Sequence, residues 1–171
     1  MPRSRAGRRF TATLITAATA MLATTALTVT AAAAPGPVPK ETEETARVLS
    51  WLTVKRTDTR PKQVRVGADW TIHSHLYTNI KGKPGKKIGD AFSHCGAVEV
   101  RNDGHVALCH RVLRTDDGSI SLTDAIDRVG KLPHGGKSAI TGGTGKYAGA
   151  EGQADITLQG DIALYVIRLE D

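Results

Sequence analysis

Two histidines, His94 and His110, have the spacing to place two imidazoles in one site. They flank residues 101–104, Arg-Asn-Asp-Gly, a run typical of a three-residue β-hairpin loop with Gly104 in the left-handed region. Counting outward along the two arms sets the histidines diagonally across from each other on one face. Two imidazoles in a dry pocket can transfer protons, because burial shifts their pKa values and a neighbour sets the tautomer. The alternative is that each histidine only hydrogen-bonds to the backbone or lies at a barrel mouth.

The hairpin face that carries these histidines is otherwise apolar. Its other members are Phe92, Val98, Val100, Val106, Leu108 and Val112. Because the apolar face of a strand pair is normally the buried one, we expect this face to line the interior. The histidines would then lie inside a largely apolar cavity.

The opposite face of the hairpin holds Cys95 and Cys109, the two cysteines of the chain. In this register Cys109 lies opposite Ala97, and Cys95 is one diagonal step away, near the outer limit of disulfide reach. A bridge therefore requires a local bulge or a slightly different register. In an oxidising exterior such a pair is bridged rather than free or metal-bound, so we predict a disulfide. Since side chains alternate between the two faces, we expect the cysteine face, which also carries Glu99, to be exposed to solvent.

A second pair of histidines, His73 and His75, is similar to the opening of a cupin metal motif, with Gly67 at the required distance before it. Residues two apart on a strand point to the same side and can share a metal ion. However, Asn and Ile occupy residues 79 and 80, where a Glu is expected, and no second half-motif with a late histidine follows. We therefore predict no metal, with these histidines on a polar strand face and Trp70 on the inward face.

The most distinctive segment is residues 139–152, Ala-Ile-Thr-Gly-Gly-Thr-Gly-Lys-Tyr-Ala-Gly-Ala-Glu-Gly. Its glycines permit positive φ and close backbone approach, which predicts a tight turn between two strands built on Gly142, Gly143, Gly145, Gly149 and Gly152. Residues 143–148 satisfy the loose dinucleotide-binding pattern, but the later glycines disrupt the helix that must follow. The glycine spacing of a P-loop is also missing.

Apolar residues after residue 46 recur mostly at every second position, in short runs separated by Gly, Asn, Asp and Pro. This spacing predicts eight strands, near residues 48–54, 64–77, 91–100, 105–113, 119–123, 138–141, 153–158 and 162–169. One helical turn fits residues 124–129, and residues 81–87, rich in Lys, Gly and Pro, fit a solvated loop. Eight strands without a long helix or an internal repeat indicate an all-β barrel or sandwich.

Residues 1–34 have the features of a signal peptide: four arginines, a stretch of Ala, Leu, Thr and Val, and small residues at the end. The stretch is too diluted for a good membrane anchor, the competing interpretation. Arg8-Arg9 hints at twin-arginine export, so the route stays open. We predict that residues 35–46 form a flexible leader and that residues 47–171 form one domain. Removing residues 1–34 lowers the net charge from +6 (23 − 17) to +2 (19 − 17), and aromatic residues are 4%; both argue against nucleic-acid binding.

The glycine-rich segment resembles the Gly-Gly-Thr-Gly turn, followed by a basic and an aromatic residue, of the allene oxide cyclase and dirigent-like barrel family. The likeness extends to Gly89-Asp90 and to residues 117–120, Asp-Gly-Ser-Ile, and covers residues 85–169. The resemblance implies an eight-stranded antiparallel β-barrel of calycin type with a mostly apolar cavity. It also implies a homo-oligomer, a trimer or a dimer, and activity without a metal or organic cofactor.

The resulting prediction is a secreted barrel that binds an apolar, polyketide- or lipid-like molecule and directs its cyclisation or isomerisation. We expect His94 and His110 to give acid/base help and Trp70 and Phe92 to form the walls of the substrate cavity. We expect no cofactor, no nucleic acid and no membrane contact after signal cleavage. One alternative is a non-catalytic dirigent-like or ligand-binding protein that uses the cavity or an outer face. The other is a cupin-like metalloenzyme.

Overall fold

A computed structural model describes residues 47–170 of the chain. The predicted signal peptide (1–34) and leader (35–46) lie outside the described residues. Within them, no helix is long and apolar enough to cross a membrane.

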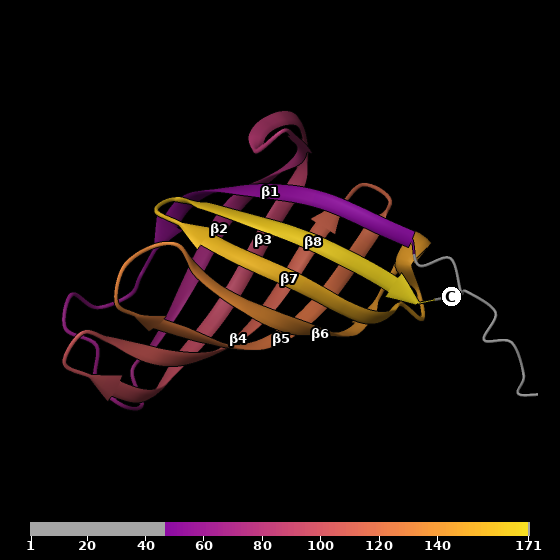
Figure 1. The fold of residues 1–171 in the computed structure, drawn as a ribbon. Coiled ribbons are helices and arrows are strands. Elements are labelled where there is room, and N and C mark those ends of the chain that lie inside the picture. Colours follow the sequence, from indigo (N-terminus) through magenta and orange to yellow (C-terminus); the bar gives the residue numbers. More distant parts are fainter. Residues whose placement is uncertain (1–46, 171) are drawn as a thin grey trace, which may run out of the picture. The chain divides into compact units, whose positions relative to one another are not determined.

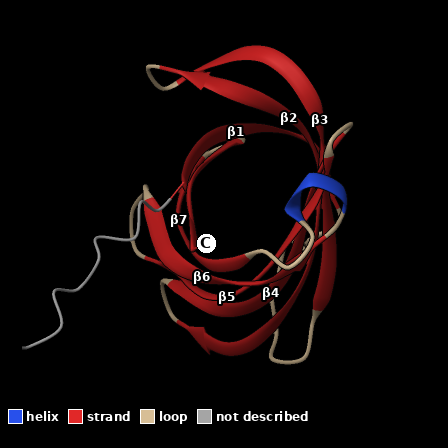
Figure 2. Cartoon of the chain, turned by 90° about the vertical axis from the view of Figure 1, so that its right-hand side faces the viewer, coloured by secondary structure: helices blue, strands red, loops and turns tan. Residues whose placement is uncertain are grey.

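The described residues form eight strands and one short 3-10 helix, η1. The strands are β1 (Arg47–Asp58), β2 (Asp69–Ile80), β3 (Lys83–Arg101), β4 (Gly104–Thr115), β5 (Gly118–Val129), β6 (His134–Gly143), β7 (Glu151–Gln159) and β8 (Ile162–Glu170), with η1 (Gly145–Tyr147) before β7. Each strand pairs antiparallel with the next, and β1 pairs with β8, so the sheet closes on itself (Figures 1 and 2). The predicted all-β, eight-stranded antiparallel β-barrel is confirmed.

The helical turn expected at residues 124–129 is wrong, because β5 continues as a strand to Val129. Asp124, Ile126 and Arg128 alternate with exposed Ala125 and Asp127 and extend the inward row of the strand. Because two of these inward residues are charged, the alternation of apolar and polar residues that indicates a strand is not visible in this part of the sequence. Their charges are accommodated inside the barrel, as described below.

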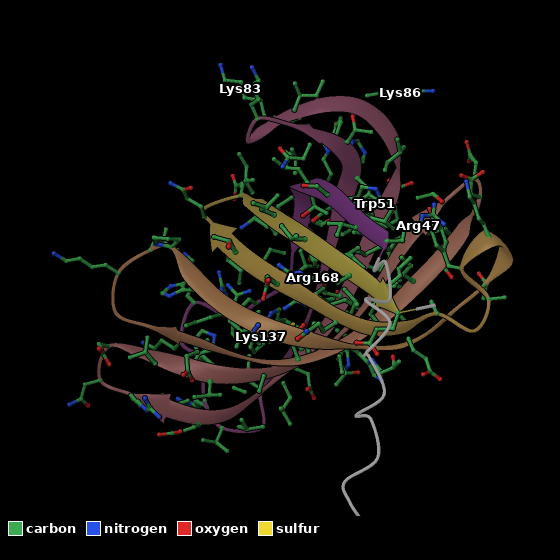
Figure 3. The ribbon with its side chains drawn as sticks, turned by 45° about the vertical axis from the view of Figure 1, so that its right-hand side comes forward. Arg47, Trp51, Lys83, Lys86, Lys137 and Arg168 are labelled. Atoms are coloured by element: carbon green, nitrogen blue, oxygen red, sulfur yellow. A yellow bond between two sulfur atoms is a disulfide. The ribbon has the colours of Figure 1, made fainter. Side chains whose placement is uncertain are left out.

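The lysine-rich segment is also more regular than predicted, since β3 begins at Lys83. Only Lys81 and Gly82 form the turn after β2, and their φ angles of 51° and 81° are those of a two-residue hairpin connection. The expected exposure of the segment is confirmed, and Lys83 and Lys86 project from the tip of this hairpin (Figure 3).

The predicted three-residue loop of the β3–β4 hairpin is wrong, because Gly104 begins β4 and pairs with Arg101, which leaves a two-residue turn. The register shifts once more at a bulge between Ala97 and Glu99. The shorter turn and the bulge together make Cys95 and Cys109 direct cross-strand partners. The predicted disulfide is confirmed, with 4.1 Å between the two Cα atoms.

The two faces of this hairpin are the reverse of those predicted. Both cysteines are buried, whereas Phe92, Leu108 and Val112 are 38%, 51% and 38% exposed. The small residues Ala91, Ala97 and Ala107 share the inner face with the disulfide. An eight-stranded barrel has an interior just wide enough to be filled by side chains, so small residues fit inside and the bulky apolar ones lie outside. Glu99 is exposed because the bulge places it and Val98 both outward.

The core of the barrel has two parts. The larger apolar cluster includes Leu76, Leu113, Ile120, Ile156 and Ile167. The smaller one joins Trp70 to the disulfide and to two alanines, with Val64 from the β1–β2 connection packed against it. The barrel is therefore packed along most of its length rather than open.

The glycine-rich segment folds, as predicted, into a tight connection between β6 and β7 that contains η1. Positive φ angles occur at four of its glycines, Gly142, Gly145, Gly149 and Gly152. At Gly145, with φ of 60°, a Cβ atom would also collide with the Asp117 carbonyl, and at Gly143 one would collide with the Tyr147 carbonyl. This close packing holds η1 at one end of the barrel (Figure 2), where the Tyr147 ring meets the Trp51 ring edge-on at 5.8 Å.

Candidate functional site

The inside of the barrel holds a small polar cavity beside the β7–β8 turn. This turn lies at the end of the barrel opposite η1 (Figure 1). The volume of the cavity is about 50 Å³, and its polar walls come from Thr53, Lys55, Asp58, Arg60, Ser74, Ser93, Arg111, Arg128, Asp161 and Tyr165. Sites for drug-sized ligands have volumes of roughly 300–1,000 Å³. This cavity therefore has room for a head group and not for a whole polyketide or lipid.

A buried ion pair forms one wall of the cavity. Arg111 on β4, 2% exposed, donates from Nε and Nη2 to the two carboxylate oxygens of Asp124 on β5, at 2.6 and 3.0 Å. Ser138 donates to the same carboxylate at 2.8 Å, and Arg111 Nη1 donates to Ser93 at 3.3 Å. Burial alone would lower the pKa of Arg111, but Tyr165 and Asp124 outweigh it and raise that pKa. The pair is fully engaged with itself and its neighbours.

Arg128, near the end of β5, is only partly compensated, because the favourable effects of Asp58 and Tyr165 are smaller than those of burial and of the neighbouring arginines. Among the described residues its guanidinium forms no ion pair, and its buried Nε has no hydrogen-bond partner. Burial and the positive charges of Arg60 and Arg111 lower its pKa to about 10. The nearby Asp58 is occupied by Arg60 and Lys55, at 3.5 and 3.4 Å. The cavity therefore has an excess of positive charge.

The residues predicted to act together, His94 and His110, do lie together, as direct cross-strand partners. They are on the outer face of the barrel, however, and the His94 side chain is 64% exposed. The expectation that they lie in the interior is wrong, because the apolar row that carries them faces outward. His110 shares its Nδ1 with the Thr123 hydroxyl at 3.0 Å, and His94 Nε2 lies 4.0 Å from Asp69.

An open groove of about 470 Å³ runs over this outer face. Its lining is mainly apolar and includes Phe92, His73, His94, His110 and Val112. The expectation that Phe92 forms a wall of an interior cavity is wrong for the same reason of parity. The groove is an exposed apolar surface of the kind that contacts a ligand or a partner. The homo-oligomer that the resemblance implies stays a prediction.

Trp70 does point inward, as predicted, but it is packed in the small core cluster beside the disulfide. Its ring meets the buried His105 ring edge-on at 5.5 Å, and it does not line the polar cavity. Its expected role as a wall of a ligand cavity has no support in its position.

Three side chains that can ligate a metal come together on the outer face of β2 and β3. The ligand atoms of His73, His75 and Asp90 all lie within 4.8 Å of one another. The sequence motif offered only the two histidines, because the carboxylate belongs to the neighbouring strand.

Other positive side chains are paired on the surface. Lys137 on β6 and Arg168 on β8 converge on Asp155 of β7, where they lower the pKa of that carboxyl group (Figure 3). These are exposed contacts of small energetic weight.

Sequence reasoning missed the buried charges altogether. A signal was present in β5, where Asp124 and Arg128 continue the every-second-residue row of Ile120, Leu122 and Ile126. A charged residue in register with a buried apolar row indicates an interior polar network. That Arg111 is the partner of Asp124, in contrast, is known only from the β4–β5 register, which makes the two residues diagonal neighbours on adjacent strands.

No family model and no curated protein matches the chain. Solved structures do. The fold is similar to that of pyocyanin demethylase, with a TM-score of 0.58 and 20% identity over 72% of this chain and 99% of that one. It is also similar to that of a pterocarpan synthase dirigent protein, with a TM-score of 0.54 and 14% identity over 80% of this chain and 95% of that one. The fold is therefore that of the allene oxide cyclase and dirigent-like barrels.

Proposed function

We propose that this barrel is a binding protein for a small molecule that carries an acidic group, with the charged end of the barrel as its site. The observation that carries the proposal is the partly buried guanidinium of Arg128 on the wall of the polar cavity, which forms no ion pair among the described residues and whose buried Nε has no hydrogen-bond partner there. A charge withdrawn from water without a partner is costly, and a bound anion would lower that cost.

The size of the cavity decides which part of a ligand enters it. At about 50 Å³ it takes a carboxylate or a similar group beside Arg128. Ile72, Leu158 and Ile162 border the same cavity, and Ile162 is 38% exposed. An apolar body attached to the acidic group can rest on these side chains. The proposed ligand is thus amphiphilic, a more specific class than the apolar molecule expected from the sequence.

The two similar solved structures are named as a pyocyanin demethylase and a pterocarpan synthase dirigent protein, so this fold is found in proteins named for an enzymatic activity. For this chain, cyclisation or isomerisation stays a prediction. Its expected acid/base pair, His94 and His110, is outside the barrel and cannot reach a molecule bound at Arg128. Binding without turnover is therefore the function that we propose.

We also propose that the protein acts after export. The support is the disulfide of Cys95 and Cys109, a bond that persists in oxidising compartments and is rare in the cytosol. The signal-like segment 1–34 gives the same expectation from sequence.

The test is calorimetric titration of the purified, disulfide-bonded protein with octanoate and with octanol, which share an apolar chain and differ in charge. We expect octanoate to bind at least about tenfold more tightly, as for hydrogen bonds to a charged group. Arg128→Gln should remove this preference. The matched control is Arg168→Gln, which removes an exposed guanidinium on the outer face and should leave it unchanged. Equal binding of acid and alcohol, or an unchanged preference in Arg128→Gln, would overturn the proposal.

A further inference from the structure

We propose that His73, His75 and Asp90 form a binding site for Zn²⁺ on the outer face of β2 and β3, completed by water. The site is independent of the ligand proposed for the barrel interior. It uses other residues, which lie on the opposite face of the sheet.

The backbone brings the three ligands together. His73 and His75 are two residues apart on β2, so their side chains leave the same face. Asp90 on β3 is the direct cross-strand partner of His75. The carboxylate that the cupin-like pattern lacks along the chain is thus supplied across the strand pair.

The distances fit a tetrahedral ion. His73 Nε2 lies 3.3 Å from Asp90 Oδ1, and all three ligand atoms are within 4.8 Å of one another. Two ligands at about 2.0–2.1 Å from Zn²⁺ in tetrahedral geometry are themselves about 3.3 Å apart. One edge of the tetrahedron is therefore formed already, and a small movement of the His75 side chain completes the three-ligand set.

Neighbouring side chains orient the ligands. The His73 ring stacks on Phe92, with ring centres 5.1 Å apart and planes 8° from parallel. The Tyr77 hydroxyl lies 3.5 Å from His75 Nδ1 and so contacts the ring of the second histidine. Such contacts to metal-binding imidazoles fix the ring and its tautomer.

Positive charges around the site compete with a cation. Lys87 Nζ lies 3.5 Å from the same Asp90 oxygen that faces His73, whereas Arg114 approaches the other oxygen at 3.9 Å and lies over the Phe92 ring. Lys87 is about half-exposed and flexible enough to leave when the ion arrives. The structure thus points to a reversible site whose affinity Lys87 lowers.

Two imidazoles and one carboxylate are donors that suit Zn²⁺ with one open position. Cu²⁺ binds such donors more tightly in general. Zn²⁺ is the ion that the tetrahedral spacing favours, and it is the probe for the test.

The test is titration of the untagged, disulfide-bonded protein with ZnCl₂ by calorimetry. We expect one ion per chain and a loss of affinity of at least about tenfold in His75→Ala, since even outer-shell changes cost roughly that much. The control His134→Ala removes a histidine from β6 and should bind as the unchanged protein does. Lys87→Ala should bind about two- to fivefold more tightly, as expected when an exposed ion pair that competes for Asp90 is removed.

Melting temperatures separate binding from folding. Without Zn²⁺, His75→Ala should melt as the unchanged protein does, because its side chain is only partly buried. With excess Zn²⁺, only a protein that binds the ion gains stability. Zn²⁺ binding that survives in His75→Ala would overturn the proposal. So would binding that is instead abolished by His94→Ala/His110→Ala, because it would place the ion at the other histidine pair.

Discussion

The charged end of the barrel interior and the outer face of β3 and β4 invert the usual distribution of polar and apolar residues. The interior contains the Arg111–Asp124 pair and Arg128, which has no ion-pair partner within residues 47–170, whereas Phe92, Leu108 and Val112 lie on the surface. Two physical conditions allow this. Inside, the pair satisfies most of its own hydrogen-bonding groups; outside, the apolar residues form one continuous face that a ligand or partner can cover. The comparison shows that apolar residues alone do not identify the inside of a small barrel.

The largest effect is expected from breaking the interior pair. Arg111→Leu leaves the Asp124 carboxylate buried without its cation, and we expect a loss of about 3–5 kcal/mol in the free energy of unfolding. Urea denaturation measures it. The control is Arg168→Leu, which removes an exposed partner of Asp155 and should cost less than about 1 kcal/mol. Similar losses in both variants would contradict the difference between the two regions.

Adjacent residues on β4 test which face is the inside. Leu113 is fully buried and Val112 is 38% exposed. We expect Leu113→Ala to cost about 2–5 kcal/mol of unfolding free energy, because it leaves a cavity. Val112→Ala should cost less than about 1 kcal/mol. If Val112→Ala were the more destabilising change, the orientation predicted from the sequence would be restored.

The disulfide stabilises the inner face of the same hairpin. Cys95 and Cys109 are 14 residues apart, and closing a loop of this length lowers the entropy of the unfolded chain. We expect Cys95→Ala/Cys109→Ala to lose about 3 kcal/mol, measured by denaturation under non-reducing conditions. An unchanged midpoint would show that the packing of the small cluster is sufficient without the bond.

The smallest effect concerns pH. Burial, and then the positive charges of Arg128 and Arg60, lower the pKa of His105 in the folded state. The unfolded chain therefore binds more protons once the pH falls below about 6.5, so stability is lost as the pH falls from there. His105→Gln should reduce the fall in melting temperature between pH 7 and pH 5. The pKa of His75 is lowered too, by burial and by Lys87, so part of the fall in melting temperature should remain in the variant. If the melting temperature of His105→Gln fell as much as that of the unchanged protein, His105 would not be the group responsible.

The residue pattern alone was sufficient to predict the strand content, the glycine-rich turn, the disulfide partners and the resemblance to this barrel class. Each of these depends on local rules: a period of two, glycine conformations and the pairing of two cysteines. The strand limits were less accurate where polar residues interrupted the pattern, as at Asp124 and in the lysine-rich hairpin.

Which face of the β3–β4 hairpin is inside follows from the closed barrel and not from the local pattern. Both rows of side chains are apolar enough to be buried, and the choice depends on the narrow interior, which the small residues and the disulfide fit. The tertiary structure also joined Arg111 to Asp124 and brought Asp90 to His73 and His75. These contacts arise between neighbouring strands, whose register closure of the barrel sets, so no local pattern encodes them.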